Sequence, residues 1–144
     1  MQNRTWMLTG VVALALALGC GRGDTSKNSN EGDLRVMLPD QGEPVREGDF
    51  DFGAVPVGES QRSSLMLVNV GSDLARITAS RFEEAPAGTF FAQAPDQVGA
   101  GEQATLVLTF APTEVGPVTG RLVLDHDGTS VRLSLNLHGE GVAP

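Results

Sequence analysis

The sequence predicts an all-β protein whose body is a single antiparallel β-sandwich of about seven strands, over residues 48–142. Three observations predict this class. Apolar and polar residues alternate in short runs, turn-forming residues separate the runs, and no run beyond the N-terminus has helical spacing. A body of about 95 residues is large enough to have its own core, because it buries roughly 65% of its unfolded surface.

The first 19 residues predict a signal peptide that is removed. Arg4 gives a positive start, and the largely apolar run 7–18 follows it. As a helix this run would rise about 18 Å, which is too short for a bilayer core of roughly 30 Å. A short apolar run between a basic start and a small residue is typical of a secretory signal.

Cys20, the only cysteine, follows this run. The segment Ala17-Leu18-Gly19-Cys20 resembles the bacterial lipobox, although Ala17 stands where leucine is usual. The resemblance implies that Cys20 carries diacylglyceryl and N-acyl chains and becomes the first mature residue, and more than one chain gives stable anchoring. Gly21 in place of aspartate favours the outer membrane of a bacterial envelope. The simpler alternative is a secreted protein with an incidental cysteine.

The acidic composition excludes some partners. Loss of residues 1–19 removes Arg4, so 9 basic residues face 18 acidic ones and the net charge goes from −8 to about −9. Such a surface repels phosphate groups, so we expect no nucleic acid partner. Without a second cysteine no intramolecular disulfide forms, so stability must come from the core.

Residues 20–47 predict the lipidated cysteine followed by a flexible linker. Residues 21–33 contain no aliphatic or aromatic side chain, which is typical of a tether. The run 34–38 alternates as a strand does before Pro39 ends it. The sequence leaves open whether this run docks on the sandwich.

The first strand of the sandwich is expected to bend. Phe50 and Phe52 are expected to face the core, with Asp51 in water. Gly53 lets the chain bend, and Pro56 cannot donate a hydrogen bond to a neighbouring strand, so this half is expected at an edge. We interpret the stretch as one strand split between the two sheets.

Further runs complete the sandwich. They are the alternating segments 65–69, 75–79, 104–110, 118–124 and 131–137, and a short strand at 90–91. Asp127-Gly128 predicts the hairpin turn between the last two strands. The domain is not of the antibody type, because it has no cysteine pair and the only tryptophan, Trp6, lies in the signal peptide.

The runs and their glycines form a series of motifs in a fixed order, which are Phe52-Gly53-x-Val55-x-Val57-Gly58, Leu65-x-Leu67-x-Asn69-x-Gly71, Leu106-x-Leu108-x-Phe110-x-Pro112, Gly120-x-Leu122-x-Leu124 and Leu133-x-Leu135-x-Leu137-x-Gly139-x-Gly141. This series resembles choice-of-anchor D and ASH/Hydin-type modules, immunoglobulin-like relatives of major sperm protein and PapD. The resemblance covers residues 48–142 and departs from the usual pattern around 74–77 and 100–101. It implies an immunoglobulin-like sandwich that acts as a non-catalytic spacer, scaffold or binding module.

No residue pattern predicts catalysis, a metal site, a cofactor or a small-molecule substrate. His126, in a predicted turn, and His138, at a strand end, are interpreted as surface residues, because neither lies in a recognisable catalytic motif. Asp125-His126-Asp127-Gly128 fits a hairpin turn better than a calcium loop, whose distal glutamate would fall at Asn136. The alternatives are a metal-dependent or hydrolytic enzyme with an unrecognised site and a chaperone-like periplasmic binding protein.

One strand has an unusual outward face. Met66 and Val68 stand where the other strands carry threonine, arginine or serine, and Val107 joins them if the two strands are neighbours. Exposed contiguous apolar surface tends to mark a contact site. Either the apolar residues of the run 34–38 fold back over this face or an external protein binds it.

Together these features predict a non-catalytic, lipid-anchored envelope protein with one interaction or scaffold domain. Cys20 would attach it to the membrane, and Met66, Val68 and Val107 would contact a protein partner of the cell envelope.

Overall fold

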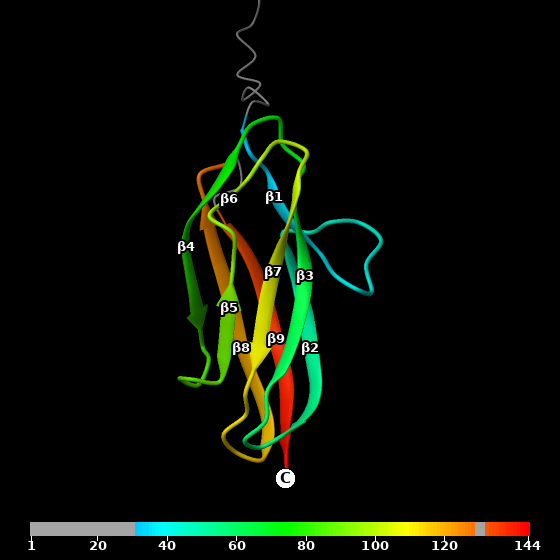
Figure 1. Ribbon diagram of the computed structural model, residues 1–144, viewed down its shortest axis with the longest axis vertical. Coiled ribbons are helices and arrows are strands. Elements are labelled where there is room, and N and C mark those ends of the chain that lie inside the picture. The colour runs from blue at the N-terminus through cyan, green and yellow to red at the C-terminus, as the bar shows by residue number, and fades with distance from the viewer. Residues whose placement is uncertain (1–30, 129–131) are drawn as a thin grey trace, which may run out of the picture.

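The computed structural model describes residues 31–128 and 132–144, and this part of the chain forms nine strands in two sheets (Figure 1). The strands are β1 (Leu34–Met37), β2 (Glu47–Pro56), β3 (Gln61–Asn69), β4 (Ala75–Glu83), β5 (Phe90–Gln93), β6 (Gln97–Val98), β7 (Gln103–Phe110), β8 (Gly116–His126) and β9 (Arg132–Val142). The expected signal peptide, Cys20 and most of the expected tether lie outside the described residues. Within the described ranges, no helix has the length and apolar character needed to cross a membrane.

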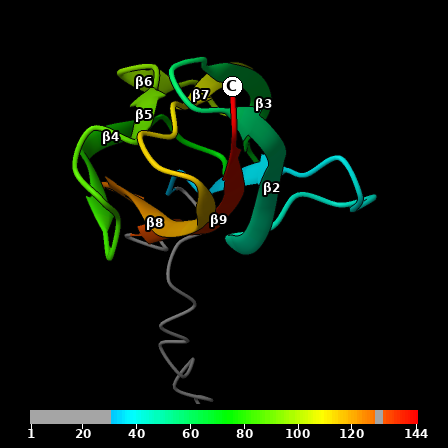
Figure 2. The same ribbon diagram turned by 90° about the horizontal axis from the view of Figure 1, so that it is seen from below.

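The two sheets form a β-sandwich, which confirms the predicted fold class. One sheet has four strands in the order β1-β3-β7-β5, and the other has five in the order β2-β9-β8-β4-β6. Seen along the strands, the two layers face each other (Figure 2). All pairings are antiparallel except β2 with β9, which run parallel. The strand count exceeds the predicted seven because β1 and β6 are added.

The core lies between the layers and follows the period-two pattern of the sequence. On β7 and β9 every second residue is buried, and the same holds for most of β8. The largest fully buried side chain is Phe110, which stacks on Phe90 with ring centroids 5.2 Å apart and lies 5.5 Å from Phe52. A β-carbon at Gly139 would collide with the Phe110 ring, so this glycine makes room for it.

The strand β2 bends at Gly53, as expected, but it does not divide between the sheets. Gly53 has φ +76°, and its amide donates to Asp51 Oδ1 at 2.8 Å. The register with β9 shifts there by a bulge, yet β2 pairs with β9 on both sides of it, up to Pro56. The predicted edge position of Pro56 is correct, and the predicted division is wrong because a bulge absorbs the bend without a change of partner.

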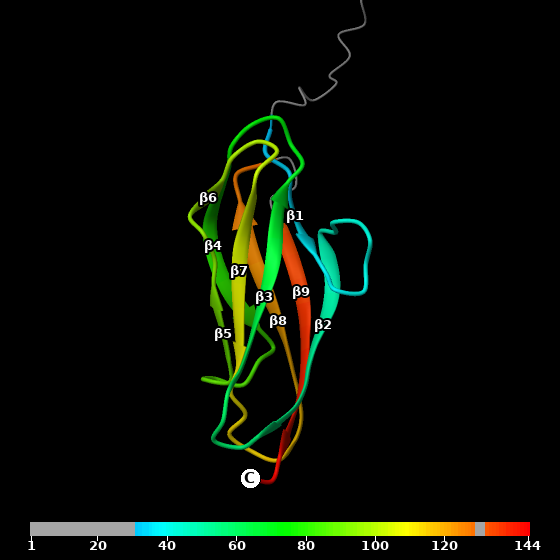
Figure 3. The ribbon, with the colours of Figure 1, turned by 45° about the vertical axis from the view of Figure 1, so that its right-hand side comes forward.

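The strand β1 lies within the segment expected to be a linker, and the sandwich therefore starts before residue 48. It pairs antiparallel with β3, and Leu34 and Val36 are fully buried in the core. On its other side, Val36 and Val45 exchange two backbone hydrogen bonds of 2.8 and 2.9 Å. The intervening loop projects from the side of the molecule (Figure 3).

The described chain begins at one end of the long axis and finishes at the other. β1 starts near the end that carries the β3–β4 connection, whereas the C-terminus lies at the end formed by the β2–β3 and β7–β8 turns (Figures 1 and 3). Both turns at the C-terminal end are therefore the parts of the sandwich farthest from the N-terminal segment.

Candidate interaction surface

The outer face of the four-stranded sheet carries the three predicted contact residues. β3 and β7 are neighbours, with Ser64 opposite Val107 and Met66 opposite Thr105. Met66 and Val107 are thus diagonal neighbours on one face, which long side chains can bridge. Met66 is 41% exposed, and Val68 and Val107 are half-buried. We call Met66, Val68 and Val107 the outer apolar patch.

The segment 34–38 does not cover this patch. Because β1 joins the edge of the sheet beside β3, Leu34 and Val36 point into the core instead of lying over the outer face. The expected covering is wrong for this reason. The outward residues of β1 extend the face, since Arg35 lies opposite Val68 and Met37 lies opposite Met66.

Phe91 extends the same face on the other side and was missed by sequence reasoning. It lies opposite Thr109 on β7 and is 51% exposed, whereas its neighbour Phe90 is buried. Successive residues of a strand point to opposite faces, so one phenylalanine of the pair must point outward. The doublet Phe90-Phe91 was the signal that identifies it. Apolar side chains therefore cross the sheet from Met37 to Phe91.

The outer face of the five-stranded sheet is polar by contrast. Asn136 donates to Asp49 Oδ1 at 3.0 Å, and His138 Nε2 lies 3.4 Å from the same oxygen. The hydrogen bonds from Asn136, first, and from His138 lower the pKa of the Asp49 carboxyl. Arg81 pairs with Asp125 and Glu83 on the same face. Exposed pairs of this kind add little stability each.

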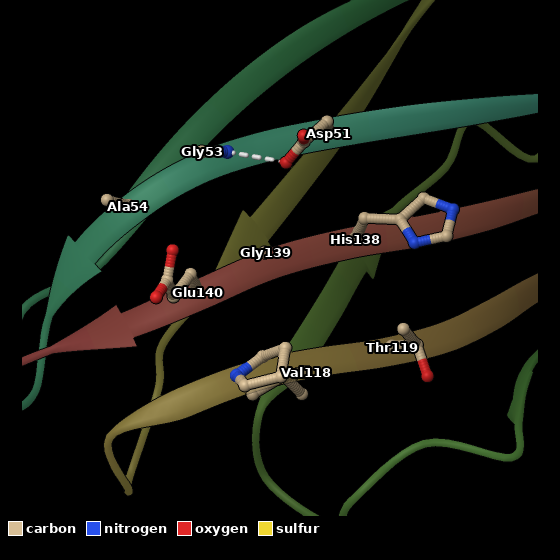
Figure 4. A pocket seen from close by; sticks show the side chains of 9 residues that line it. Asp51, Gly53, Ala54, Val118, Thr119, His138, Gly139 and Glu140 are labelled. Atoms are coloured by element: carbon tan, nitrogen blue, oxygen red, sulfur yellow. Dashed lines mark hydrogen bonds between the residues drawn. The ribbon is translucent and has the colours of Figure 1, made fainter.

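A shallow hollow of about 260 Å³ lies over β2, β8 and β9 on this polar face (Figure 4). His138, Asp51 and Glu140 surround it, and its floor includes Gly139. His138 and Asp49 resemble part of a catalytic arrangement, yet no serine or cysteine lines the hollow. In the described ranges, no group of three or more histidine, cysteine, aspartate or glutamate side chains is arranged to hold a metal ion.

His126 is not the surface residue that the sequence suggested. It is the last residue of β8 and only 2% exposed. Its Nδ1 accepts a hydrogen bond from the Gly128 amide at 3.2 Å, and its Nε2 is buried without a partner among the described residues. His126 lies on the core face of β8 with Leu122 and Leu124. This alternation identifies His126 as a buried residue, but the turn-like sequence Asp-His-Asp-Gly favoured a surface turn.

Burial lowers the pKa of His126, because the charged imidazolium loses its hydration there. The carboxylates of Asp33, Asp127 and Asp125 oppose this shift, and the Arg46 charge adds to it. The unfolded chain therefore takes up a proton at higher pH than the folded chain. The difference between the two pKa values therefore contributes to the free energy of unfolding. This contribution is fully present above the ordinary histidine pKa of about 6.5, and it is lost as the pH falls through that value toward the lower pKa of the folded state.

We expect the free energy of unfolding to fall by up to about 1 kcal/mol between pH 7.5 and 5.5, measured by urea unfolding. The variant His126→Gln removes the titrating ring and should flatten this dependence. Thr105→Gln, which places the same new side chain at an exposed position, is the matched control and should leave it intact. An unchanged slope in His126→Gln would contradict the assignment.

Asn69 organises the end of the sandwich where residue 31 enters. Its side chain is fully buried, and its Oδ1 accepts from the amides of Asp33 at 2.9 Å and Gly71 at 3.0 Å. Its Nδ2 donates to the carbonyls of Asp73 at 2.7 Å and Val98 at 2.9 Å. One side chain thereby joins the start of β1, the β3–β4 connection and β6.

The Asn-x-Gly motif also requires its glycine. A β-carbon at Gly71 would collide with the backbone of Glu31 and Asp33. Asp33 is itself held by Arg46 at 2.7 Å and Arg35 at 2.9 Å. Burial alone would raise the pKa of Asp33, but the hydrogen bonds and charges of the two arginines outweigh it and lower that pKa. These contacts hold β1 against the rest of the sandwich.

The fold and its two contrasting faces define an immunoglobulin-like, PapD-like β-sandwich protein. The chain belongs to the ASH family (abnormal spindle-like microcephaly-associated, ASPM-SPD-2-Hydin), whose sequence model matches residues 42–132. Domains of this family are typically non-catalytic. No curated protein matches the sequence.

Solved structures from several organisms have the same fold. A protein of unknown function from Porphyromonas gingivalis W83 has a TM-score of 0.62 and 12% identity, over 78% of this chain and 48% of that one. PapD-like domain 7 of human CEP192 has a TM-score of 0.58 and 14% identity, over 79% and 88%. The VesB protease of Vibrio cholerae has a TM-score of 0.54 and 12% identity, over 79% and 33%. The chain thus spans about half of the first of these proteins, and at such identities the likeness shows the fold alone.

Proposed function

We propose that this protein is a non-catalytic, lipid-anchored component of the bacterial cell envelope that presents one immunoglobulin-like interaction domain. The observation that carries the interaction role is the outer apolar patch together with Met37 and Phe91, which form an apolar strip across the outer face of the four-stranded sheet with Met66 41% exposed. A partly exposed apolar strip among polar residues suits a protein partner, because a buried apolar contact supplies most binding energy.

The anchoring part of the proposal is supported by the sequence around Cys20 and by the position of β1. This first described strand starts at one end of the long axis (Figure 1). A lipid on Cys20 would hold that end toward the membrane and present the sheet faces and the opposite end to the surroundings. The outer membrane is the proposed location, and envelope proteins are the proposed partners.

Anchoring is tested by labelling cells with a radioactive fatty acid. We expect the label on the wild-type protein and none on Cys20→Ser, because that side chain is the only thiol in the sequence. Unlabelled wild-type protein, or label that persists in Cys20→Ser, would contradict the anchor. Membrane fractionation then separates the inner membrane from the outer one.

The contact surface is tested by cross-linking in native membranes. The variant Met66→Lys places a charge in the outer apolar patch, and we expect at least a tenfold loss of the cross-linked partner, since a buried unpaired charge is costly. Thr119→Lys, exposed on the outer face of the other sheet, is the matched control and should keep the partner. Equal capture by the wild type and Met66→Lys would contradict the assignment of this face.

A further inference from the structure

The two sheets are closed along one side of the sandwich and open along the other. On the closed side, the segment after β1 folds back, and Val36 and Val45 exchange backbone hydrogen bonds. On the open side, β5 ends the four-stranded sheet, and the two-residue β6 ends the five-stranded sheet but covers β4 only at Ala75 and Arg76. The Ile77 amide still donates to Asp96, and beyond it residues 78–83 pair only with β8 in the described part of the chain.

This open edge has unpaired backbone groups. In an antiparallel ladder alternate residues direct their N–H and C=O groups to opposite sides, so about half of those in residues 78–83 point away from β8. Edge strands usually avoid pairing through proline, a short length, a β-bulge or an inward-pointing charge, and the bulge of β4 lies between Ile77 and Ala79, before the regular stretch 79–83. Residues 78–83 contain no proline, and the charged Arg81 and Glu83 lie on the outer face, where they pair with each other.

A groove of about 390 Å³ runs beside this edge, between β4 and β5. Its walls are made of small or uncharged residues, and one of the nine is charged: Ile77, Thr78, Ala79, Ser80, Ala92, Gln93, Ala94, Pro95 and Asp96. In Figures 1 and 2 these strands bound the side of the molecule where the layers separate.

The inner faces of the two edge strands are incompletely covered at this groove. Ser80 lies opposite Leu124, which is fully buried, so Ser80 is on the core-facing side of β4 and yet is exposed. Ala92 lies opposite the buried Leu108 and is likewise on the core-facing side of β5. Both side chains are small, and both line the groove.

We propose that the edge of β4 over residues 78–83 binds an extended segment of a partner polypeptide as an added strand. The backbone of that segment would pair with β4, and apolar side chains at every second position would fill the space beside Ser80 and Ala92. The chemistry that selects the partner is an extended chain with alternating apolar residues and no bulky charge on its inner side. The inference rests on the proposed role as an interaction domain but uses a surface separate from the outer apolar patch.

The test uses the full-length protein and a short fluorescent peptide of alternating valine and threonine with terminal lysines. Binding is followed by fluorescence anisotropy. Two further peptides carry N-methyl groups on one or the other set of alternate amides. Because only one side of an added strand pairs with β4, we expect one methylated peptide to bind at least tenfold more weakly and the other to bind as the parent does.

A variant of the protein tests where the peptide binds. Ser80→Glu directs a charge into the groove and should weaken binding at least tenfold, whereas Thr105→Glu, exposed on the outer face of the other sheet, carries the same charge and should have no effect. Circular dichroism confirms that both variants fold. Met66→Lys should also leave peptide binding unchanged, so failure of the outer apolar patch and failure of this edge are distinguishable.

Three results of the peptide assay would overturn the inference. They are no binding of the parent peptide, equal sensitivity to both methylation patterns, and binding that Ser80→Glu leaves unchanged. Sedimentation provides a further check on the occupant. If the protein alone forms a dimer that Ser80→Glu dissociates, a second copy of this chain occupies the edge, and the proposal of a different partner fails.

Discussion

Asn69→Ala is expected to lower the free energy of unfolding by about 3 kcal/mol or more. The change leaves four backbone groups without the partner that Asn69 supplies, and each buried unsatisfied group costs roughly 1–3 kcal/mol before relaxation. For a domain of this size the melting temperature should fall by roughly 10 °C or more. Urea and thermal unfolding measure both quantities.

Two further variants make this result specific to hydrogen bonding. Asn69→Asp keeps the volume and the acceptor oxygen but cannot donate to the Asp73 and Val98 carbonyls, so we expect it to be at least as destabilising at neutral pH. Asn136→Ala removes an asparagine that bonds Asp49 on the exposed face and should change stability by less than about 0.5 kcal/mol. A mild effect of both Asn69 variants would refute the role assigned to this side chain.

Phe110→Ala is expected to cost roughly 3–5 kcal/mol, because the ring is fully buried and its loss leaves a cavity. Phe90 stacks on this ring, Phe52 packs against it at a tilt, and Gly139 leaves room for it. The surrounding backbone belongs to paired strands and can close the cavity only in part. Urea unfolding of the purified variant measures the loss, and failure to fold at all would be the extreme form of the expected result.

Phe91→Ala is the matched control for this change. It removes the same ring from the same part of the fold, but Phe91 is 51% exposed on the outer face. We expect it to cost less than about 1 kcal/mol. Equal losses in the two variants would mean that the core is not where the structure places it.

The layered architecture was predictable from local patterns. β7 and β9 alternate with so few exceptions that their buried residues can be assigned from the sequence. The Asn-x-Gly and Asp-Gly motifs fall where β3 and β8 end, as expected of turn-forming residues. Long-range pairing was not predictable in the same way. The parallel pairing of β2 with β9 and the docking of β1 depend on which edges the rest of the sheet leaves free.

The surface residues were predictable only in part. The sequence grouped Val107 with Met66 only on the condition that their strands are neighbours, and the structure places the two strands side by side. Their role in binding stays a prediction. Met37 was missed because β1 was assigned to the linker, and His126 was misplaced because a turn motif and a buried alternating position coincide at the end of β8. In both cases the local signal was present but a competing one was preferred.

The parallel pairing of β2 with β9 bears on how the domain would respond to tension. β9 lies between β2 and β8 and leads to the C-terminus, which is at the opposite end from residue 31 (Figure 1). The hydrogen bonds that hold β9 run across the strand, so a tensile load along its length strains them all simultaneously instead of peeling them apart in sequence. If the N-terminal end is held and the C-terminus is pulled, β9 would therefore be loaded in shear.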